Sequence, residues 1–319
     1  MRETVNLPES AAHPVAEEFR LPVPQATGSV CPERSLWASL VALFKVRVVL
    51  LLLIAAVGGA FVAAGGWPGT GELALLLASG GLAAAGASAI NQYLERELDA
   101  RMERTRRRPL AARSFTRTRW VPYAGAVMIL LPSLAVLPFK PALGTFLLLG
   151  AAIYIAVYTV WLKPRTPLNI VVGGAAGSAA VLSGSAAAGH WAEPGALMLA
   201  ALVFLWTPTH FWSLAIAYRD DYARGGFPML PVQTTPRVAA WWVLLHTGGT
   251  ALAALALATH PSLGWLYFLP VGLATLSLLA LSIRLIARPS PQRALALFHT
   301  SNLYLAVVML MICVNTLMS

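Results

Sequence analysis

Charged residues are scarce in this chain of 319 residues. Asp, Glu, Lys and Arg make up 11% of it, whereas a water-soluble domain carries about a quarter, and mean hydropathy reaches +0.69. This scarcity excludes an ordinary soluble fold. Cysteine is scarcer still. Cys31 and Cys313 are the only two, and they lie too far apart in the sequence to indicate a disulfide framework or a cysteine metal site.

The first 35 residues lack an apolar run and an excess of arginine. These absences exclude a secretory signal and an arginine-rich transit peptide. Prolines and glutamates are frequent there, and such a segment buries too little apolar surface to fold. We expect residues 1–35 to form a disordered cytoplasmic tail and residues 36–319 to form one membrane domain of a bacterial protein.

Long apolar runs, by contrast, are abundant. Hydrophobic residues make up 58% of the chain, and they fall in blocks of about twenty, the length of helix that crosses a bilayer's hydrocarbon core. The expected spans are roughly 44–65, 73–94, 120–138, 142–162, 168–189, 195–217, 238–259, 264–286 and 297–317. The predicted fold class is an all-α polytopic membrane protein with nine transmembrane helices.

Basic residues outnumber acidic ones, and the formal net charge is +10. In a soluble protein this excess would suggest nucleic acid, but in so apolar a chain it is typical of cytoplasmic loops. Every Lys and Arg except Lys140 falls in the tail, in the loops that a count of nine spans places on one side, or at the ends of spans next to them. We therefore expect a bacterial plasma membrane protein with a cytoplasmic N-terminus, a C-terminus on the opposite side and no nucleic-acid partner.

Acidic residues number 13, and those outside the tail and two short loops form two clusters. In the first cluster, Asn91, Glu95 and Asp99 recur every four residues and so share one stripe of a helix. One interpretation is an acidic helix face neutralised by the neighbouring Arg96 and Arg101. The other is a magnesium site, because Mg²⁺ prefers hard oxygen ligands and is often held by one or two carboxylates plus substrate phosphates.

Arginines follow the first cluster closely, at positions 104 and 106–108. Guanidinium groups suit phosphate because they donate two parallel hydrogen bonds. The second cluster, residues 218–224, repeats the mixture of charges around Asp220 and Asp221. Two such clusters on one membrane face match what a metal-bridged diphosphate requires.

These segments resemble the UbiA superfamily of intramembrane prenyltransferases from about residue 40 to the C-terminus. The motifs that carry the resemblance are NQYLERELDARMERTRRRP at 91–109, YTVWLKPRTPLNIVVGG at 158–174, TPTHFWSLAIAYRDDYARGGFPMLPV at 207–232, and the early basic pair Lys45 and Arg47. The chain departs from the family where Glu95 and Glu97 replace the usual aspartates. It departs again at Pro164, where an arginine is common, and at 178–181, which lack a frequent proline pair.

The resemblance implies a nine-helix bundle around a central cavity and an Mg²⁺-dependent prenyl transfer. It implies that the metal ligands are Asn91, Glu95, Asp99, Asp220 and Asp221, with Asn91, Glu95, Asp99 and Asp221 as the catalytic group. It also implies that the diphosphate is bound by Lys45, Arg47, Arg104, Arg108, Lys163 and Arg165.

The acceptor is also implied by the resemblance. Tyr218 and Tyr222 stand where the quinone-pathway members have outer aspartates, and this pattern is typical of the members that prenylate heme. The expected reaction transfers farnesyl from farnesyl diphosphate to a vinyl group of heme b and adds water, giving heme O. Candidate heme contacts are His210, Tyr158 and Tyr222, and a downstream heme A synthase or an oxidase assembly factor is a candidate partner.

Three alternatives stay open at this point. His210 could have a purely structural role as a histidine that hydrogen-bonds a neighbouring helix. A prenyltransferase of quinone precursors would use the same diphosphate site with another acceptor. A secondary transporter would also place charges inside a helical bundle, but near the middle of the membrane, whereas the acidic residues here lie at helix ends.

Overall fold

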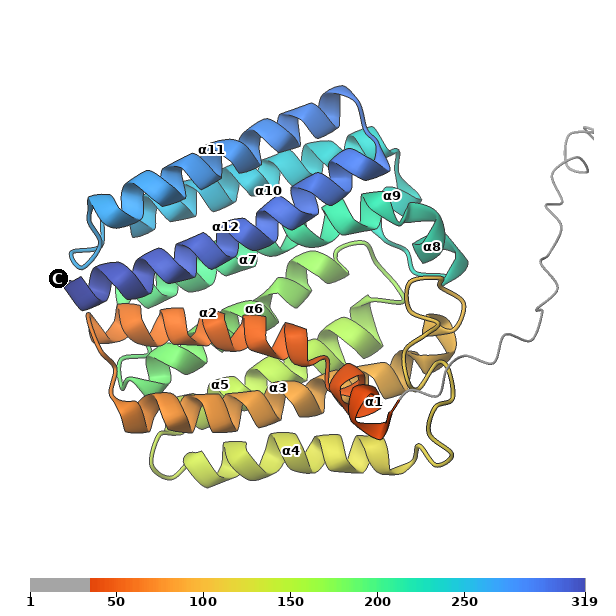
Figure 1. The fold of residues 1–319 in the computed structure, drawn as a ribbon, viewed down its shortest axis with the longest axis horizontal. Helices are drawn as coiled ribbons and strands as arrows, with labels where there is room; N and C mark the ends of the chain where they lie inside the picture. The colour runs from red at the N-terminus through yellow and green to blue at the C-terminus, as the bar shows by residue number, and fades with distance from the viewer. Residues whose placement is uncertain (1–34, 319) are drawn as a thin grey trace, which may run out of the picture. The chain divides into compact units, whose positions relative to one another are not determined.

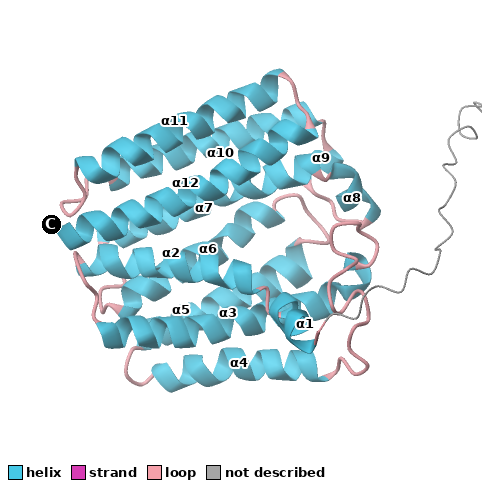
Figure 2. Cartoon of the chain, in the orientation of Figure 1, coloured by secondary structure: helices cyan, strands magenta, loops and turns pink. Residues whose placement is uncertain are grey.

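The computed structural model describes residues 35–318, and these are helical throughout apart from turns and loops (Figure 2). The helices are α1 (Leu36–Leu43), α2 (Val46–Ala64), α3 (Thr70–Asp99), α4 (Trp120–Val136), α5 (Pro141–Ala152), η1 (Ile153–Leu162), α6 (Asn169–Ala187), α7 (Pro194–Ala217), α8 (Arg219–Arg224), α9 (Leu230–Gln233), α10 (Pro236–Leu257), α11 (Trp265–Ala287) and α12 (Pro291–Met318). The tail expected at 1–35 lies outside the described residues except for Ser35.

Each of the nine expected spans coincides with a helix in the described chain. Eight helices are long and apolar enough to cross a membrane, with α5 and η1 together forming one of them, Pro141–Leu162. The ninth, α4, is apolar but has only 17 residues. It packs along α3, where Gly86 and Gly125 let the two backbones meet. The all-α polytopic membrane fold is therefore confirmed.

The helices of residues 36–318 lie side by side as one bundle (Figure 1). Helix α2 packs on α6, α6 on α7, and α7 on both α10 and α12. The closest of these approaches is between α2 and α6. A Cβ atom at Gly184 would overlap the carbonyl oxygen of Ala56, so only glycine lets the two backbones come this close.

The span that follows Pro141 changes its helical form midway. After Ala152 it continues as the π-helix η1, in which hydrogen bonds join residues five apart. The turn after η1 keeps this spacing, since the Lys163 N–H donates to the Tyr158 carbonyl at 2.8 Å. The Thr159 hydroxyl also donates to a carbonyl five residues back, that of Tyr154, at 2.8 Å. Nothing in the sequence analysis predicted this form.

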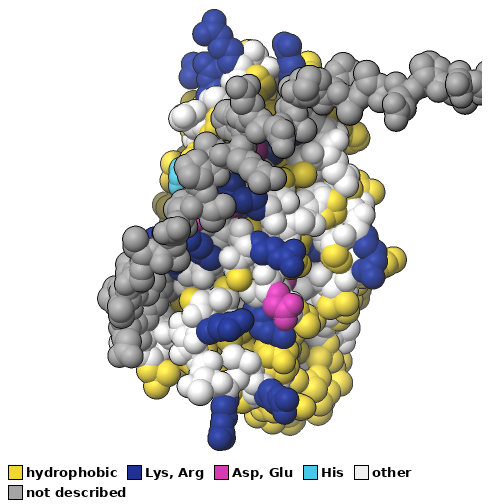
Figure 3. All heavy atoms as spheres, turned by 90° about the vertical axis from the view of Figure 1, so that its right-hand side faces the viewer, with side chains coloured by type: hydrophobic (Ala, Val, Ile, Leu, Met, Phe, Trp, Pro, Cys, Tyr) yellow, Lys and Arg dark blue, Asp and Glu magenta, His cyan; other side chains and the backbone are white. Residues whose placement is uncertain are grey.

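One end of the bundle carries the basic loops. It holds the connection between α3 and α4 together with α8 and α9 (Figure 1), and Figure 3 shows Lys and Arg side chains gathered on it. Lys140 lies at the other end, where its Nζ atom is 3.8 Å from a Glu72 carboxylate oxygen and donates to the Ala187 carbonyl at 2.6 Å. The described residues thus keep the two-sided charge distribution predicted from the span count.

Candidate active site

A cavity of about 460 Å³ opens between α2, α3, the α5–η1 span, α6, α7 and α12. Its charged lining comes from the basic end of the bundle, and most of the remainder is apolar or small. The charged side chains that line it are Lys45, Glu95, Asp99, Arg104, Arg108 and Lys163, and the amide side chains are Asn91 and Asn302. Most of the residues predicted from the first acidic cluster and its basic neighbours therefore meet in one place.

The predicted stripe of α3 lies along this cavity. Asn91, Glu95 and Asp99 all line it and are 1%, 4% and 1% exposed. Burial of carboxylates at this depth is costly unless each is paired. Each polar group in the stripe must therefore have a partner in the structure.

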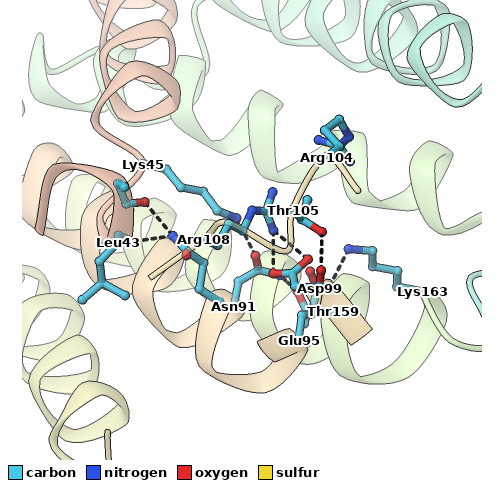
Figure 4. Close-up of polar contacts among 12 residues, drawn as sticks. Leu43, Lys45, Asn91, Glu95, Asp99, Arg104, Thr105, Arg108, Thr159 and Lys163 are labelled. Carbon is cyan, nitrogen blue, oxygen red and sulfur yellow. Dashed lines mark hydrogen bonds and ion pairs between the residues drawn. The ribbon is translucent and has the colours of Figure 1, made fainter. Parts of the chain in front are cut away.

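Each of the three side chains is held by a different cation (Figure 4). Lys45 Nζ donates to Asn91 Oδ1 at 2.6 Å, and Lys163 Nζ donates to Glu95 Oε1 at 2.5 Å. Arg108 donates to both carboxylate oxygens of Asp99, at 3.0 and 2.8 Å. The cations come from the start of α2, from the end of η1 and from the loop after α3, so the site ties three segments together.

The interpretation in which Arg96 and Arg101 neutralise the stripe is wrong. Arg96 pairs instead with the exposed Glu97, at 3.3 Å. Among the described residues, the ion pairs of Glu95 and Asp99 are formed with Lys163 and Arg108.

Lys45 connects the stripe to the π-helix. Its Nζ atom also donates to the Tyr154 hydroxyl at 3.2 Å, while Asn91 Nδ2 donates to Thr159 Oγ1 at 2.9 Å. Burial lowers the pKa of Lys45 to about 7, and the positive charge of Arg108 adds to this effect.

The two aspartates of the second acidic cluster lie beside the cavity and not in its wall. Asp221 accepts hydrogen bonds from the backbone N–H groups of Glu103, at 2.6 Å, and Arg104, at 3.2 Å, and from the Arg224 guanidinium at 2.8 Å. These bonds outweigh burial, which opposes ionisation, and lower the pKa of Asp221. Asp220 is exposed. Both aspartates line a separate recess at the end of the bundle.

Asp221 thereby shapes the loop that follows α3. The loop carries Arg104, whose guanidinium donates to the Tyr222 hydroxyl at 3.1 Å and lies over the rings of Tyr218 and Tyr222. Arg104 lines both the cavity and the recess. The second cluster therefore reaches the cavity through Arg104 and Tyr222.

Two predicted diphosphate-binding residues do not reach the cavity. Arg165 is exposed and donates to the carbonyls of Val160 and Trp161, within its own segment. Arg47 is exposed too, and it is absent from the cavity wall although Lys45 lines it. A residue two positions along a helix faces away from the first, and this explains the separation of Lys45 from Arg47.

The predicted acceptor contacts all line the cavity. Tyr222 and His210 are 7% and 9% exposed, and Tyr158 stacks on Tyr154 with ring centroids 5.8 Å apart. A Cβ atom at Gly173 would come within 2.7 Å of the Tyr158 ring, so the glycine makes room for that side chain.

Sequence reasoning missed several residues of the site. Tyr154 accepts a hydrogen bond from Lys45, Thr159 accepts one from Asn91, and Phe298 packs against His210 with ring centroids 4.4 Å apart. Tyr154 had a usable signal, since it precedes Tyr158 by one helical turn. Thr159 had none, because its position depends on the π-helix.

The donor atoms fit a magnesium ion with a phosphate ligand. Glu95 and Asp99 are two carboxylates on one stripe of the cavity wall, and the Asn91 amide oxygen adds a third hard donor. Among the described residues, no group of three or more His, Cys, Asp or Glu side chains stands close enough to hold a metal by itself. The set therefore suits an ion that completes its coordination with substrate oxygens and water.

Comparison with known proteins agrees with this geometry. A sequence model described as the UbiA prenyltransferase family matches residues 51–308. Protoheme IX farnesyltransferase 1 of Saccharopolyspora erythraea is 39% identical over 310 residues, covering 96% of each chain. Protoheme IX farnesyltransferase of Metallosphaera sedula is 36% identical over 275 residues, covering 86% of this chain and 95% of the relative.

Solved structures share the fold at low identity. A structure described for digeranylgeranylglyceryl phosphate synthase superimposes with a TM-score of 0.74 at 13% identity, over 89% of this chain and 99% of that one. A UbiA homologue from Archaeoglobus fulgidus bound to GPP and Mg²⁺ gives 0.56 at 16% identity, over 86% and 99%. With its cavity, its motifs and these relatives, the chain belongs to the UbiA prenyltransferase family.

Proposed function

We propose that this protein transfers the farnesyl group of farnesyl diphosphate to a vinyl group of heme b. A new carbon–carbon bond forms as the allylic C–O bond breaks, diphosphate leaves, and water adds to the resulting cation with loss of a proton, giving heme O. The observation that carries the proposal is a single cavity that joins a charged end to an apolar interior and an aromatic wall around His210. Relatives named protoheme IX farnesyltransferase support the choice of substrates.

The acidic stripe is the proposed magnesium site. The ion would be held by Glu95, Asp99 and the Asn91 amide oxygen. Their hard oxygen atoms and their place in the cavity wall support this assignment. When bound, Mg²⁺ would neutralise the negative charge that grows on the departing diphosphate. A UbiA homologue bound to GPP and Mg²⁺ is consistent with this role. The ligand roles of Asp220 and Asp221 stay predictions.

Four basic residues form the proposed diphosphate site: Lys45, Arg104, Arg108 and Lys163. All four line the cavity, and three of them already contact the acidic stripe. As the diphosphate binds, Lys45, Arg108 and Lys163 exchange a contact with the stripe for one with a phosphate oxygen. They then stabilise the leaving group as the C–O bond breaks. Arg47 and Arg165 stay predictions without a contact to the cavity.

The apolar interior is the proposed place of the farnesyl chain. Gly80, Ala83, Ala84 and Ala87 of α3 line it with small side chains, which leave room for a long isoprenoid. Excluding water there protects an allylic carbocation from premature hydrolysis. The ring of the acceptor would lie along the wall formed by His210, Tyr158 and Tyr222.

The setting of the enzyme is part of the proposal. We place it in a bacterial plasma membrane with the basic end, and hence the N-terminus, on the cytoplasmic side and the C-terminus on the other. The gathering of Lys and Arg at that end supports this orientation (Figure 3). A heme A synthase or an oxidase assembly factor is the proposed recipient of the product.

Expression in cells that make only heme b tests the function. Extracted hemes should include heme O with the wild-type chain and should lack it with Asp99→Ala. Asp221→Ala should reduce it strongly. Heme b alone, with a well-folded wild-type protein in the membrane, would refute the proposal. Prenylation of an aromatic quinone precursor under the same conditions would favour the other acceptor class.

A further inference from the structure

His210 lies in α7 with both faces of its ring covered. The Trp206 ring is nearly parallel to it, with centroids 4.6 Å apart and planes 18° apart. The Phe298 ring of α12 lies at 4.4 Å and 28°. Two rings at these distances cannot share one face of an imidazole, so they cover opposite faces. Packing therefore fixes the plane of the His210 ring.

Ser301 determines which nitrogen of His210 carries the proton. Nδ1 lies 2.8 Å from Ser301 Oγ, and the same hydroxyl donates to the Phe298 carbonyl at 2.7 Å. A serine hydroxyl has one proton and a carbonyl oxygen has none, so this proton lies between Ser301 Oγ and the carbonyl. Nδ1 must then be protonated and donate to Ser301 Oγ.

The same serine also anchors one of the covering rings. Trp206 Nε1 donates to the Ser301 carbonyl at 2.9 Å. The backbone of Ser301 thus holds the indole while its hydroxyl holds the imidazole. One residue of α12 sets both the plane and the tautomer of His210.

The remaining nitrogen, Nε2, is left with a free lone pair. His210 is 9% exposed and forms no ion pair among the described residues, so a charged imidazole would be costly there. The ring is therefore neutral, with its proton on Nδ1. Trp206 and Phe298 cover its faces, Ser301 covers Nδ1, and the Phe211 ring lies perpendicular to it with centroids 5.2 Å apart. His210 lines the cavity and its Nε2 has no hydrogen-bond partner among the described residues, so Nε2 is the polar atom left for a ligand in the cavity.

We propose that Ser301 is a positioning residue that fixes His210 with an unprotonated Nε2, so that this nitrogen ligates the iron of the acceptor. The inference rests on the proposed function, in which heme is the acceptor. It selects iron over a propionate as the partner of His210, because a bare lone pair binds a Lewis acid and cannot donate to a carboxylate. Metal-binding histidines usually hold their other N–H in such a bond, and losing it weakens metal affinity about 10- to 100-fold.

Titration of the purified full chain in detergent tests the proposal. Ferric heme and iron-free protoporphyrin are each added, and binding is followed by absorbance, with electron paramagnetic resonance for the iron. Ser301→Ala should weaken ferric heme binding about 10-fold or more and alter the iron spectrum, while leaving the affinity for the iron-free ring unchanged. Ser301→Thr, which keeps the hydroxyl, should restore the affinity for ferric heme and the wild-type iron spectrum. His210→Ala should lose the histidine-ligated spectrum.

A matched control removes an equivalent hydroxyl elsewhere. Ser133 is fully buried in α4, donates to the Ile129 carbonyl at 2.7 Å and does not line the cavity. Ser133→Ala should leave both affinities unchanged. Ser301→Cys, with a sulfur that accepts hydrogen bonds weakly, should shift heme binding in the same direction as the alanine variant. Ser301→Cys replaces Ser301→Ala in the test if the alanine variant does not fold.

The outcomes separate the two proposals. A wild-type protein that binds no heme overturns the proposed acceptor, and the role of Ser301 with it. A His210-dependent iron spectrum that is the same in the folded Ser301 variants overturns only the role of Ser301. Equal weakening for heme and the iron-free ring also overturns it, because the loss would then come from the shape of the pocket.

Discussion

Lys163, the residue that follows the π-helix, donates a hydrogen bond of 2.5 Å to Glu95, 68 positions earlier in the chain. Both side chains are almost fully buried, at 11% and 5% exposure. The pair joins the motif at 91–109 to the motif at 158–174. It is therefore expected to matter for folding as well as for diphosphate binding.

Replacing Lys163 with methionine should destabilise the protein by about 3–5 kcal/mol, because it leaves a buried carboxylate without its partner. Thermal unfolding of the purified protein in detergent measures this loss. Arg165→Met is the matched control, since Arg165 is exposed and bonds only to carbonyls of its own segment. The double variant Glu95→Gln with Lys163→Met should recover most of the stability and none of the activity. A stable single variant would contradict the prediction.

Asp99→Asn should lower farnesyl transfer by on the order of 100-fold or more. The change removes the carboxylate charge that holds the proposed Mg²⁺, and the ion is what stabilises the leaving diphosphate. The requirement for added Mg²⁺ should rise in the same variant. Labelled farnesyl diphosphate and extraction of the hemes from reconstituted vesicles measure both effects. Glu97→Gln is the control, because Glu97 is exposed and pairs only with Arg96 among the described residues. Equal activity in the two variants would remove Asp99 from the site.

Asp221→Asn should weaken the loop after α3, because the carboxylate accepts two backbone hydrogen bonds there. Bonds to a charged group contribute about 1.5–3 kcal/mol, so thermal stability and the affinity for prenyl diphosphate should both fall. Asp220→Asn, at the exposed neighbouring position, should change neither by a comparable amount. Binding of a non-hydrolysable prenyl diphosphate analogue provides the measurement.

The same aspartate predicts a pH dependence of stability. The pKa of Asp221 is lowered in the folded protein. Its contribution to the free energy of unfolding is therefore complete above the unfolded pKa of about 3.9 and is lost as the pH falls through the folded pKa. The stability difference between wild type and Asp221→Asn should therefore stay constant from neutral pH to about pH 5 and shrink in stronger acid. A difference that already shrinks between neutral pH and about pH 5 would contradict the assignment.

Gly184→Ala should destabilise the bundle by about 1–3 kcal/mol, because the new methyl group overlaps the Ala56 carbonyl and forces α2 and α6 apart. Gly248→Ala is the control. A Cβ atom there meets nothing within 4 Å, and alanine favours a helix by about 1 kcal/mol over glycine. Melting temperatures in one detergent should move in opposite directions for the two variants.

Much of the fold was predictable because a bilayer imposes a simple length rule. Apolar blocks of about twenty residues identify spans without any knowledge of packing. The shared stripe of Asn91, Glu95 and Asp99 was predictable too, since helical periodicity alone places them together. Their partners were not. Lys45 and Lys163 come from segments distant in the chain, and only the packed bundle brings them to α3.

The predicted site residues that do not line the cavity have a common physical reason for their placement. Arg47 and Arg165 carry the right charge next to residues that do line the cavity, but a helix turns neighbouring side chains to different faces. The family resemblance implies that Asp221 is a metal ligand, and this stays a prediction, but the sequence does not reveal that its carboxylate accepts hydrogen bonds from two backbone N–H groups. Charge type is visible in a sequence, but the direction of a side chain depends on the local backbone.

The π-helix sets a limit on how this span can vary. Its hydrogen bonds join residues five apart, whereas those of a regular helix join residues four apart, so the segment packs more residues into the same length. Removing a single residue from 153–162 would let the segment return to α-helical form without breaking the span. Lys163 would then turn away from Glu95, and Thr159 away from Asn91. This stretch of the protein therefore tolerates a change of side chain far better than a change of length.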